Sequence, residues 1–327
     1  MKILSYELRD GDLKATLFAE SEDLAGAGGA REAVEDCIRR LGKEKEIGEP
    51  ALPRVTRMEE KNGGIEFDFD AAVRPQIELG QYLNLRVYVP SDAEKDLPIL
   101  MTAADGMRVS IPETYLSRKT DLLVRDRMQD VAGRSAFIAL ADSLAILRMA
   151  ADKLGHTCPE EQLWELAVAV ADETSGSGAR LRSERDLADT LTAALLPSGA
   201  TETDAETVFL CLRERAEEKR RRSPEDLASE TFACYLRMAG KTEEGLRAEL
   251  REQAMELVRI DLLIDEVVRR ENLGLTQKEF RAALRTIASR FDMPEREVLD
   301  WIGEKTLRAQ LIRDKARAMI VDSAVTL

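Results

Sequence analysis

The sequence predicts an α+β head, made of a small antiparallel sheet and one helix, followed by a large all-α domain with arm-like helices. Two-residue alternation of apolar side chains is confined to residues 1–90, whereas from Ile111 onward the apolar spacing is typical of helices. Aromatic residues make up only 5% of the chain, and Ala, Leu, Glu and Arg abound, which disfavours a large sheet sandwich. At 327 residues the chain is long enough for two or three domains.

A β-hairpin and a helix open the head. Apolar residues alternate over 4–8 and again over 13–19, and Asp10-Gly11 between them suits the positive φ angles of a tight turn. Gly26 to Gly29 indicates a flexible joint. The following segment, Ala30 to Lys45, has the pattern of a charged helix with one apolar face.

Further strands complete the head. Asn62-Gly63-Gly64 indicates a turn, residues 65–73 give the clearest alternation in the sequence, and residues 83–89 give one more alternating run. We therefore expect a domain over 1–90 in which one helix covers an antiparallel sheet. Residues 91–110 are expected to form a linker.

The rest of the chain, 111–327, is predicted to be a helical body. Ser110-Ile-Pro-Glu113 is a helix start, and residues 131–222 contain four helical patterns separated by turns, which indicates an inserted helical module. Thr174 to Gly178 is expected to form a flexible tip within this module.

The C-terminal stretch predicts a long helix over roughly 243–271, a break, a second helix, a short third helix and a returning helix. Thr276 precedes Glu279 by three residues, the spacing of a capping box, and Leu275 and Phe280 flank it at the spacing of a hydrophobic staple. Pro294 suits the first turn of the short helix, and Gly303 is expected to end it.

This C-terminal order resembles a known family. The run KTEEGLRAELREQAMELVRIDLLIDEVVRRENLGLTQKEF, continuing through SRFDMPEREVLDWI, is similar to the C-terminal domain of trigger factor, the ribosome-associated chaperone, and to the helical core of SurA-type chaperones. The resemblance covers 223–324. It implies a helical substrate-binding domain.

The head shares the resemblance. IGEPALPRV followed by IEFDFDAAVRPQIELGQYLNLRV has the order of the ribosome-docking domain of trigger factor, and IPETYLSRKTDLLVRDRM resembles the start of its arm region. The family's GFRxGKxP docking loop is missing, because only SEDLAGAGGA stands between Glu20 and Arg31. Docking on a ribosome by that loop is therefore in question. No segment matches the family's prolyl-isomerase domain, so we expect that activity to be absent.

Charge and composition exclude several classes of protein. The net charge of -14 opposes general nucleic-acid binding, because phosphates would be repelled. The N-terminus lacks the apolar core of a signal peptide, and no apolar run reaches membrane-spanning length. The four cysteines are far apart and show no metal or redox spacing. We therefore expect a cytoplasmic protein.

Chemistry-bearing motifs are scarce. His156 and Cys158 are the one conceivable nucleophile pair, but the preferred interpretation of His156 is a solvent-facing turn residue just outside a helix cap. They provide at most two ligands, too few for a metal site. No phosphate-binding loop, GxSxG or HExxH is present. We expect no enzyme activity, no cofactor and no metal. The basic run from Lys219 to Arg222 is expected to end a helix, with an acidic partner or RNA as the alternative.

Apolar surface is the remaining candidate for function, because slender helical arms cannot hide every large apolar side chain. The candidate substrate-binding residues are aromatics and methionines of the module and the C-terminal stretch: Phe137, Met149, Trp164, Phe280, Phe291, Met293, Trp301 and Met319. Taken singly, each also suits a protein core.

With the family resemblance, these residues indicate an ATP-independent chaperone that binds unfolded or nascent polypeptides between head and arms. The alternative is an assembly or scaffold protein with the same fold that binds one specific native partner. The sequence leaves the oligomeric state open, including whether the chain dimerises.

Overall fold

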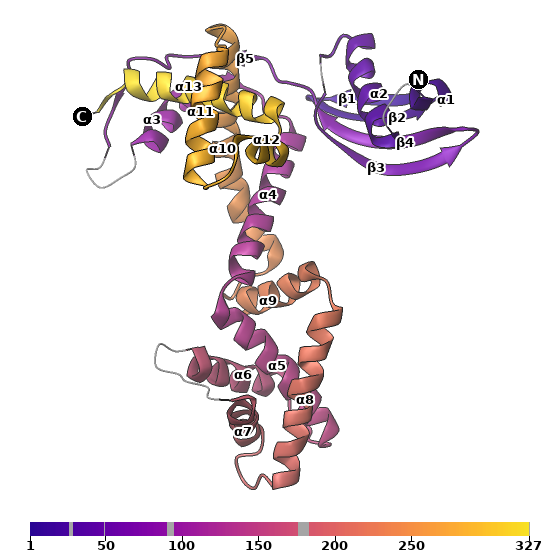
Figure 1. Ribbon diagram of the computed structural model, residues 1–327, viewed down its shortest axis with the longest axis vertical. Helices are drawn as coiled ribbons and strands as arrows, with labels where there is room; N and C mark the ends of the chain where they lie inside the picture. The colour runs from indigo at the N-terminus through magenta and orange to yellow at the C-terminus, as the bar shows by residue number, and fades with distance from the viewer. Residues whose placement is uncertain (26–28, 49, 90–94, 176–182, 327) are drawn as a thin grey trace. The chain divides into compact units, whose positions relative to one another are not determined.

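The computed structural model describes residues 1–25, 29–48, 50–89, 95–175 and 183–326 (Figure 1). The chain divides into two compact units, the first formed by Met1–Thr120 with Arg251–Leu327 and the second by Asp121–Leu250. The expected joint over Gly26–Gly29 and the expected tip over Thr174–Gly178 lie mostly outside the described residues.

The first unit begins with a four-stranded antiparallel sheet of order β1-β2-β4-β3. Its elements are β1 (Lys2–Arg9), β2 (Asp12–Ala19), the short helix α1 (Ser21–Ala25), α2 (Ala30–Glu44), β3 (Ala51–Lys61) and β4 (Gly64–Ala72). Asp10 and Gly11 have φ of 49° and 86°, and Asn62 and Gly63 have φ of 47° and 75°. Both hairpins thus close through two residues with positive φ, as their sequences predict.

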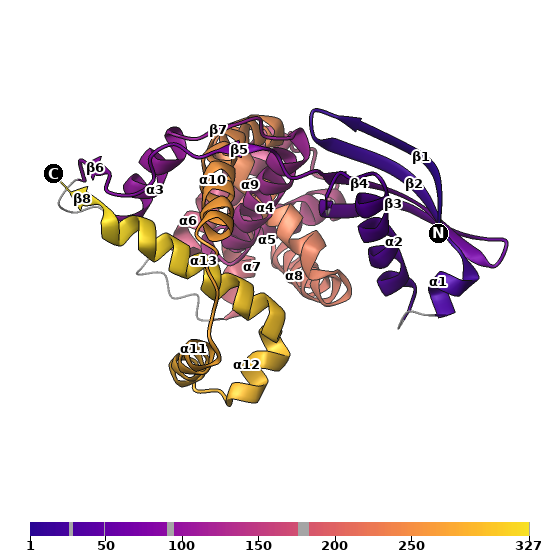
Figure 2. The same ribbon diagram turned by 90° about the horizontal axis from the view of Figure 1, so that it is seen from above.

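The head core lies between α2 and one face of the sheet. Every second residue of β2 and β4 is buried, and these side chains meet the apolar stripe of α2; the core contains Leu13, Leu17, Phe67, Phe69, Val34, Cys37, Ile38 and Leu41. Figure 2 shows α1 and α2 on the same side of the sheet. The outer strand β3, whose residues are mostly exposed, has no counterpart among the predicted alternating runs.

The remainder of the first unit is a helical body. It contains β5 (Ile77–Glu78), β6 (Arg86–Val87), α3 (Asp96–Asp105), β7 (Arg108–Val109), the start of α4 (Glu113–Ala132), the end of α10 (Glu243–Arg270), α11 (Gln277–Arg290), α12 (Glu295–Ile302), α13 (Glu304–Ser323) and β8 (Val325–Thr326). α3, α10 and α13 share one core, and β8 pairs in parallel with β6.

Two expectations for this region differ from the structure. The predicted strand over 83–89 is reduced to Arg86–Val87. The expected linker, 91–110, contains α3, whose Ile99, Leu100 and Ala103 are fully buried in the body core. The sequence LPILMTAA is apolar enough to bury a helix on most sides, which a search for one-faced periodicity does not detect.

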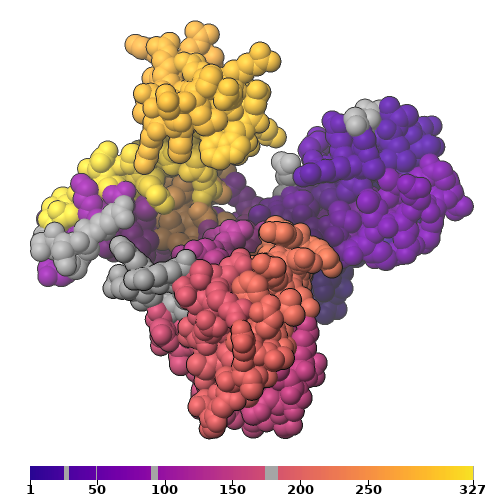
Figure 3. All heavy atoms as spheres, turned by 60° about the horizontal axis from the view of Figure 1, so that its bottom comes forward, coloured from indigo at the N-terminus to yellow at the C-terminus, as the bar shows by residue number. Residues whose placement is uncertain are grey.

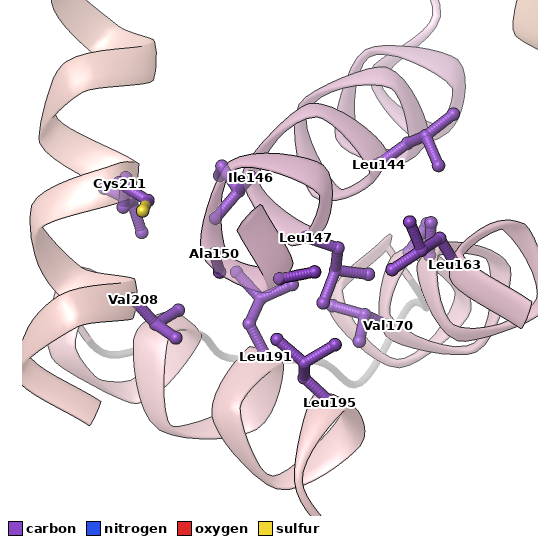
Figure 4. Close-up of a cluster of buried hydrophobic side chains, with 14 of the residues drawn as sticks. Leu144, Ile146, Leu147, Ala150, Leu163, Val170, Leu191, Leu195, Val208 and Cys211 are labelled. Carbon is purple, nitrogen blue, oxygen red and sulfur yellow. The ribbon is translucent and has the colours of Figure 1, made fainter. Parts of the chain in front are cut away.

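The second unit is helical and contains the end of α4, α5 (Ser135–Lys153), α6 (Glu160–Ser175), α7 (Glu184–Leu195), α8 (Glu202–Arg221), α9 (Pro224–Met238) and the start of α10. Figure 4 shows its core, in which side chains of four helices point toward one another: Leu144, Ile146, Leu147, Ala150, Leu163, Val170, Leu191, Leu195, Val208 and Cys211.

A charged cluster also ties this unit together. Arg215 of α8 is only 4% exposed, and its guanidinium donates to Asp142 of α5 at 3.1 Å, to Glu218 at 3.1 Å and to Glu230 of α9 at 2.8 Å. The basic run Lys219–Arg222 lies at the C-terminal end of α8, which confirms the helix-end interpretation. Lys219 and Arg222 join the same cluster through Asp142 and Glu230.

The predicted fold class is confirmed: a small antiparallel sheet with a helix is followed by a large helical part. The boundaries predicted for the head, the helical body and the inserted module 131–222 stay predictions. Within the described residues, no helix combines the length and the apolar character that crossing a membrane requires.

Candidate functional site

The candidate site is the hairpin of α11 and α12, whose local sequence determines each of its ends. Thr276 accepts a hydrogen bond from the backbone N–H of Glu279 at 3.2 Å, and the Glu279 carboxylate accepts one from the N–H of Thr276 at 2.7 Å. This is the predicted capping box. Gly303, with φ of 83°, separates α12 from α13.

Charge around the cap strengthens it. The backbone N–H of Thr276, the ammonium of Lys315 at 2.9 Å and the Thr276 hydroxyl lower the pKa of Glu279 from 4.5 to about 2. Lys315 belongs to α13 and also donates to the carbonyl of Gly274. The start of α11 is therefore fixed to the returning helix.

A small apolar core holds the hairpin together. Its buried members come from α11, α12 and the returning helix α13: Phe280, Leu284, Ala288, Val298 and Leu307. The expected staple residue Leu275 packs against this core with Met293. The guanidinium of Arg308 lies 3.9 Å from the centroid of the Phe280 ring and covers it. Phe280 is thus buried, and its ring is not available to a ligand.

Two aromatic rings remain outside this core. Phe291 is 54% exposed and Trp301 is 68% exposed, and their rings meet edge to face with centroids 6.2 Å apart. Met293 lies half-buried between the two helices, next in sequence to the turn after α11. The hairpin is the yellow-orange group of atoms at the top of Figure 3. We call Phe291, Met293 and Trp301 the hairpin patch.

The other candidate residues lie elsewhere. Phe137 is half-buried and packs edge to face on Tyr235, with centroids 5.5 Å apart. Trp164 is half-buried beneath the guanidinium of Arg237, at 4.3 Å from the ring centroid. Met149 packs against the core of the second unit, and Met319 is half-buried on α13. Of the eight candidates, the structure places Phe291 and Trp301 among the exposed large apolar residues.

Sequence reasoning missed a second set of exposed apolar side chains on the edges of the head sheet. Tyr6 and Leu8 of β1 stand opposite Ala15 and Leu13, and Val55 and Met58 of β3 stand opposite Phe69 and Phe67. All four side chains therefore lie on the same face of the sheet as α2, which covers only the centre of that face, and all four are exposed. The sequence does not indicate that β1 and β3 lie at the edges of the sheet. Their apolar side chains are exposed because α2 packs over the inner strands β2 and β4.

The thiol candidate gains no support from the geometry. His156 is exposed, and its backbone N–H donates to the carbonyl of Ala151 at 2.8 Å. This bond belongs to the turn after α5, in which Gly155 has a φ of 63°. Burial raises the pKa of the Cys158 thiol, which reduces its thiolate fraction. Within the described ranges, no group of three or more His, Cys, Asp or Glu side chains could hold a metal ion.

Comparison with known proteins identifies the C-terminal region first. Residues 217–322 match the family model of the bacterial trigger factor protein C-terminus. This region contains α10 to α13 and thus the hairpin patch. This part of the chain is therefore similar to the trigger factor C-terminus, and the predicted resemblance is confirmed.

Similarity to trigger factors extends over most of the chain. It is 28% identical over 280 residues to the trigger factor of Acidiphilium cryptum (strain JF-5), which covers 82% of this chain and 57% of that protein. It is 26% identical over 270 residues to the trigger factor of Citrifermentans bemidjiense, covering 80% and 57%. The chain thus spans little more than half the length of these two relatives.

One solved structure is also similar, described as "Promiscuous Substrate Recognition in Folding and Assembly Activities of the Trigger Factor Chaperone". It covers 98% of this chain and 99% of its own at 11% identity and a TM-score of 0.34.

Proposed function

We propose that this protein is an ATP-independent chaperone that binds unfolded or nascent polypeptides in the cytoplasm through exposed apolar surface, and that it has no prolyl-isomerase activity. The hairpin patch is the observation that carries the proposal. It lies in the region that matches the trigger factor C-terminus, and it exposes two of the largest apolar side chains of the chain. Exposed apolar surface of this kind marks interaction sites in soluble proteins.

The chemistry of the patch suits loose and unspecific binding. Two aromatic rings offer flat apolar area, and the thioether of Met293 adapts to different shapes. Within the described residues, no Lys or Arg side chain lies over the ring of Phe291 or Trp301, whereas the guanidinium of Arg308 lies over the ring of Phe280. A binding site of weak apolar contacts releases its client by fast dissociation, so a nucleotide cycle is not required.

The test is suppression of aggregation by the full chain. A chemically denatured client is diluted into buffer with increasing amounts of wild type or of the double variant Phe291→Ala/Trp301→Ala, and light scattering is followed. We expect the variant to be needed at about tenfold higher concentration, which corresponds to about 1.4 kcal/mol, because aromatic residues are enriched among the few contacts that carry most of a binding free energy.

The matched control is Leu122→Ala/Leu210→Ala. These leucines are about half exposed on α4 and α8, and isolated exposed leucines are ordinary on protein surfaces. This control should act like wild type. Failure of wild type to suppress aggregation at stoichiometric amounts contradicts the proposal. Recovery of a single native protein at one-to-one stoichiometry in a pull-down would instead support a scaffold that binds one partner.

A further inference from the structure

The outer side of β1 is a row of backbone groups with no neighbouring strand among the described residues (Figure 2). The two-residue turn at Asp10-Gly11 makes Arg9 and Asp12 a hydrogen-bonded pair, and hydrogen-bonded and non-hydrogen-bonded pairs alternate along the ladder from there. Leu8 and Tyr6 therefore belong to non-hydrogen-bonded pairs. Their N–H and C=O groups point away from β2, toward the open edge.

The two faces of this edge differ in chemistry. Tyr6 and Leu8 face the same side as α2, and they are 46% and 39% exposed at the border of the head core. Ser5, Glu7 and Arg9 face the other side, where Glu7 and Arg9 make an ion pair. Residues directly opposite each other in an antiparallel pair share a face. A strand added to β1 would thus meet apolar side chains on one face and polar side chains on the other.

The opposite edge of the sheet, β3, has features that prevent pairing with a further strand. Its register with β4 shifts before Arg54 and again after Val55, and Pro53 lacks a backbone N–H. Four of the five residues from Arg57 to Lys61 are charged, and charge also protects an edge. In β1, by contrast, the register is regular from Ser5 to Arg9. The sheet is therefore protected at β3 and open to pairing at β1.

We propose that the edge of β1 binds an extended segment of a non-native polypeptide as an added β-strand, with apolar side chains at alternate positions beside Tyr6 and Leu8. The outward N–H and C=O groups of these two residues recur at every second position, the spacing at which an extended strand presents its own groups. The alternation of apolar and polar residues follows from the two faces of the edge. Folded proteins keep such alternating segments within their sheets, so an unfolded chain is their source.

The occupant is a client of the proposed chaperone, so this proposal rests on the proposed function, although β1 and the hairpin patch are different surfaces of the first unit. The test uses the full chain and fluorescence anisotropy of a labelled peptide with the core Thr-Val-Thr-Val-Thr-Val, flanked by Gly and Ser. The variant Tyr6→Pro removes one outward N–H, and an edge strand tolerates proline where that N–H faces solvent. It should bind the peptide about tenfold more weakly than wild type, because a backbone hydrogen bond and a contact with an aromatic ring are lost.

The matched control is Met58→Pro on the protected edge. Met58 is the fourth residue before the two-residue turn of the β3-β4 hairpin, as Tyr6 is in the β1-β2 hairpin, and both side chains are exposed on the α2 side. Met58→Pro should bind the peptide like wild type, and circular dichroism should show the same sheet content in both variants. Equal weakening of peptide binding by the two proline variants overturns the proposal.

A second measurement needs no variant of the protein. The same peptide with an N-methyl group on every residue of its core keeps its side chains but has no backbone N–H to donate. Wild type should bind this peptide at least about tenfold more weakly than the unmethylated one. Equal binding of the two peptides overturns the proposal, because side-chain contacts alone would then explain the binding.

Failure of this proposal is distinguishable from failure of the proposed function. The double variant Phe291→Ala/Trp301→Ala should bind the unmethylated peptide like wild type, and loss of binding in that variant would move the peptide site to the hairpin patch. Failure of the proposed function appears instead as no suppression of aggregation by wild type. Dimers that Tyr6→Pro abolishes and Met58→Pro does not, together with no binding of the peptide, would assign the edge to a second copy of this chain and overturn the assignment to a client.

Discussion

Removal of the buried guanidinium of Arg215 tests how the second unit is held together. In Arg215→Met the apolar stem of the side chain is largely kept, and the hydrogen bonds to Asp142, Glu218 and Glu230 are lost. Breaking a buried ion pair by removing one partner typically costs about 3–5 kcal/mol, because a buried charge is left unpaired.

The structure moderates that value. Asp142 keeps Lys219 at 2.6 Å, Glu230 keeps Arg222 at 2.6 Å, and both carboxylates are about a quarter exposed. Neither is left without a cation. We therefore expect Arg215→Met to lower the unfolding free energy of the second unit by about 2–3 kcal/mol, below the range for a fully stranded charge.

The assay must report on the second unit alone. The chain contains two tryptophans, Trp164 in the second unit and Trp301 in the first, so urea unfolding in a Trp301→Phe background follows Trp164 fluorescence. The matched control is Arg221→Met, on the same helix, where the side chain is 79% exposed and makes one ion pair with Glu217. That control should cost less than about 0.5 kcal/mol. If both variants lose the same stability, or if Arg215→Met loses less than about 1 kcal/mol, the reasoning about burial is refuted.

Two further predictions concern the first unit. Glu279→Gln should lower the stability of the hairpin at pH 7, as followed by Trp301 fluorescence. The lowered pKa of Glu279 means that the ionised carboxylate stabilises the hairpin fully above pH 4.5 and no longer below about pH 2. The difference in stability between variant and wild type should therefore shrink as the pH falls from 4.5 to about 2. A difference independent of pH would contradict it. Gly42→Ala should cost about 1–3 kcal/mol in thermal unfolding, because the added Cβ would lie 2.0 Å from the carbonyl oxygen of Gly48; Gly274→Ala, with open space around it, is the control.

The sequence predicts the local chemistry of the chain well. Turns that need positive φ at Asp10-Gly11 and Asn62-Gly63, the capping box of Thr276 and Glu279, and the helix end at Gly303 all form as expected. Each depends on a few neighbouring residues whose backbone preferences are strong. The fold class follows from the same signals, because two-residue and helical periods separate cleanly along the chain.

Exposure is harder to predict, because it depends on which element covers which. The alternating run at Tyr6 and Leu8 resembles that at Leu13 and Leu17, yet only the second pair is buried, since α2 packs over the inner strands. The helix α3 is not predicted from the sequence for a related reason. It is apolar on most sides, so it lacks a one-faced pattern, and it lies in a segment that contains Pro98 and Gly106.

Phe280 and Phe291 show the same limit within the candidate site. Both are candidate substrate-binding residues, but Phe280 lies in the first turn of α11, where Arg308 of α13 covers its ring, and Phe291 lies at the C-cap of α11. A hairpin with so small a core cannot enclose every ring, because small units bury a small share of their surface. The ring of Phe280 is therefore covered by Arg308, whereas the ring of Phe291 is exposed beside Trp301. The exposed aromatic pair follows from the size of the hairpin, and substitutions that fill or lengthen its core should reduce patch exposure and client binding together.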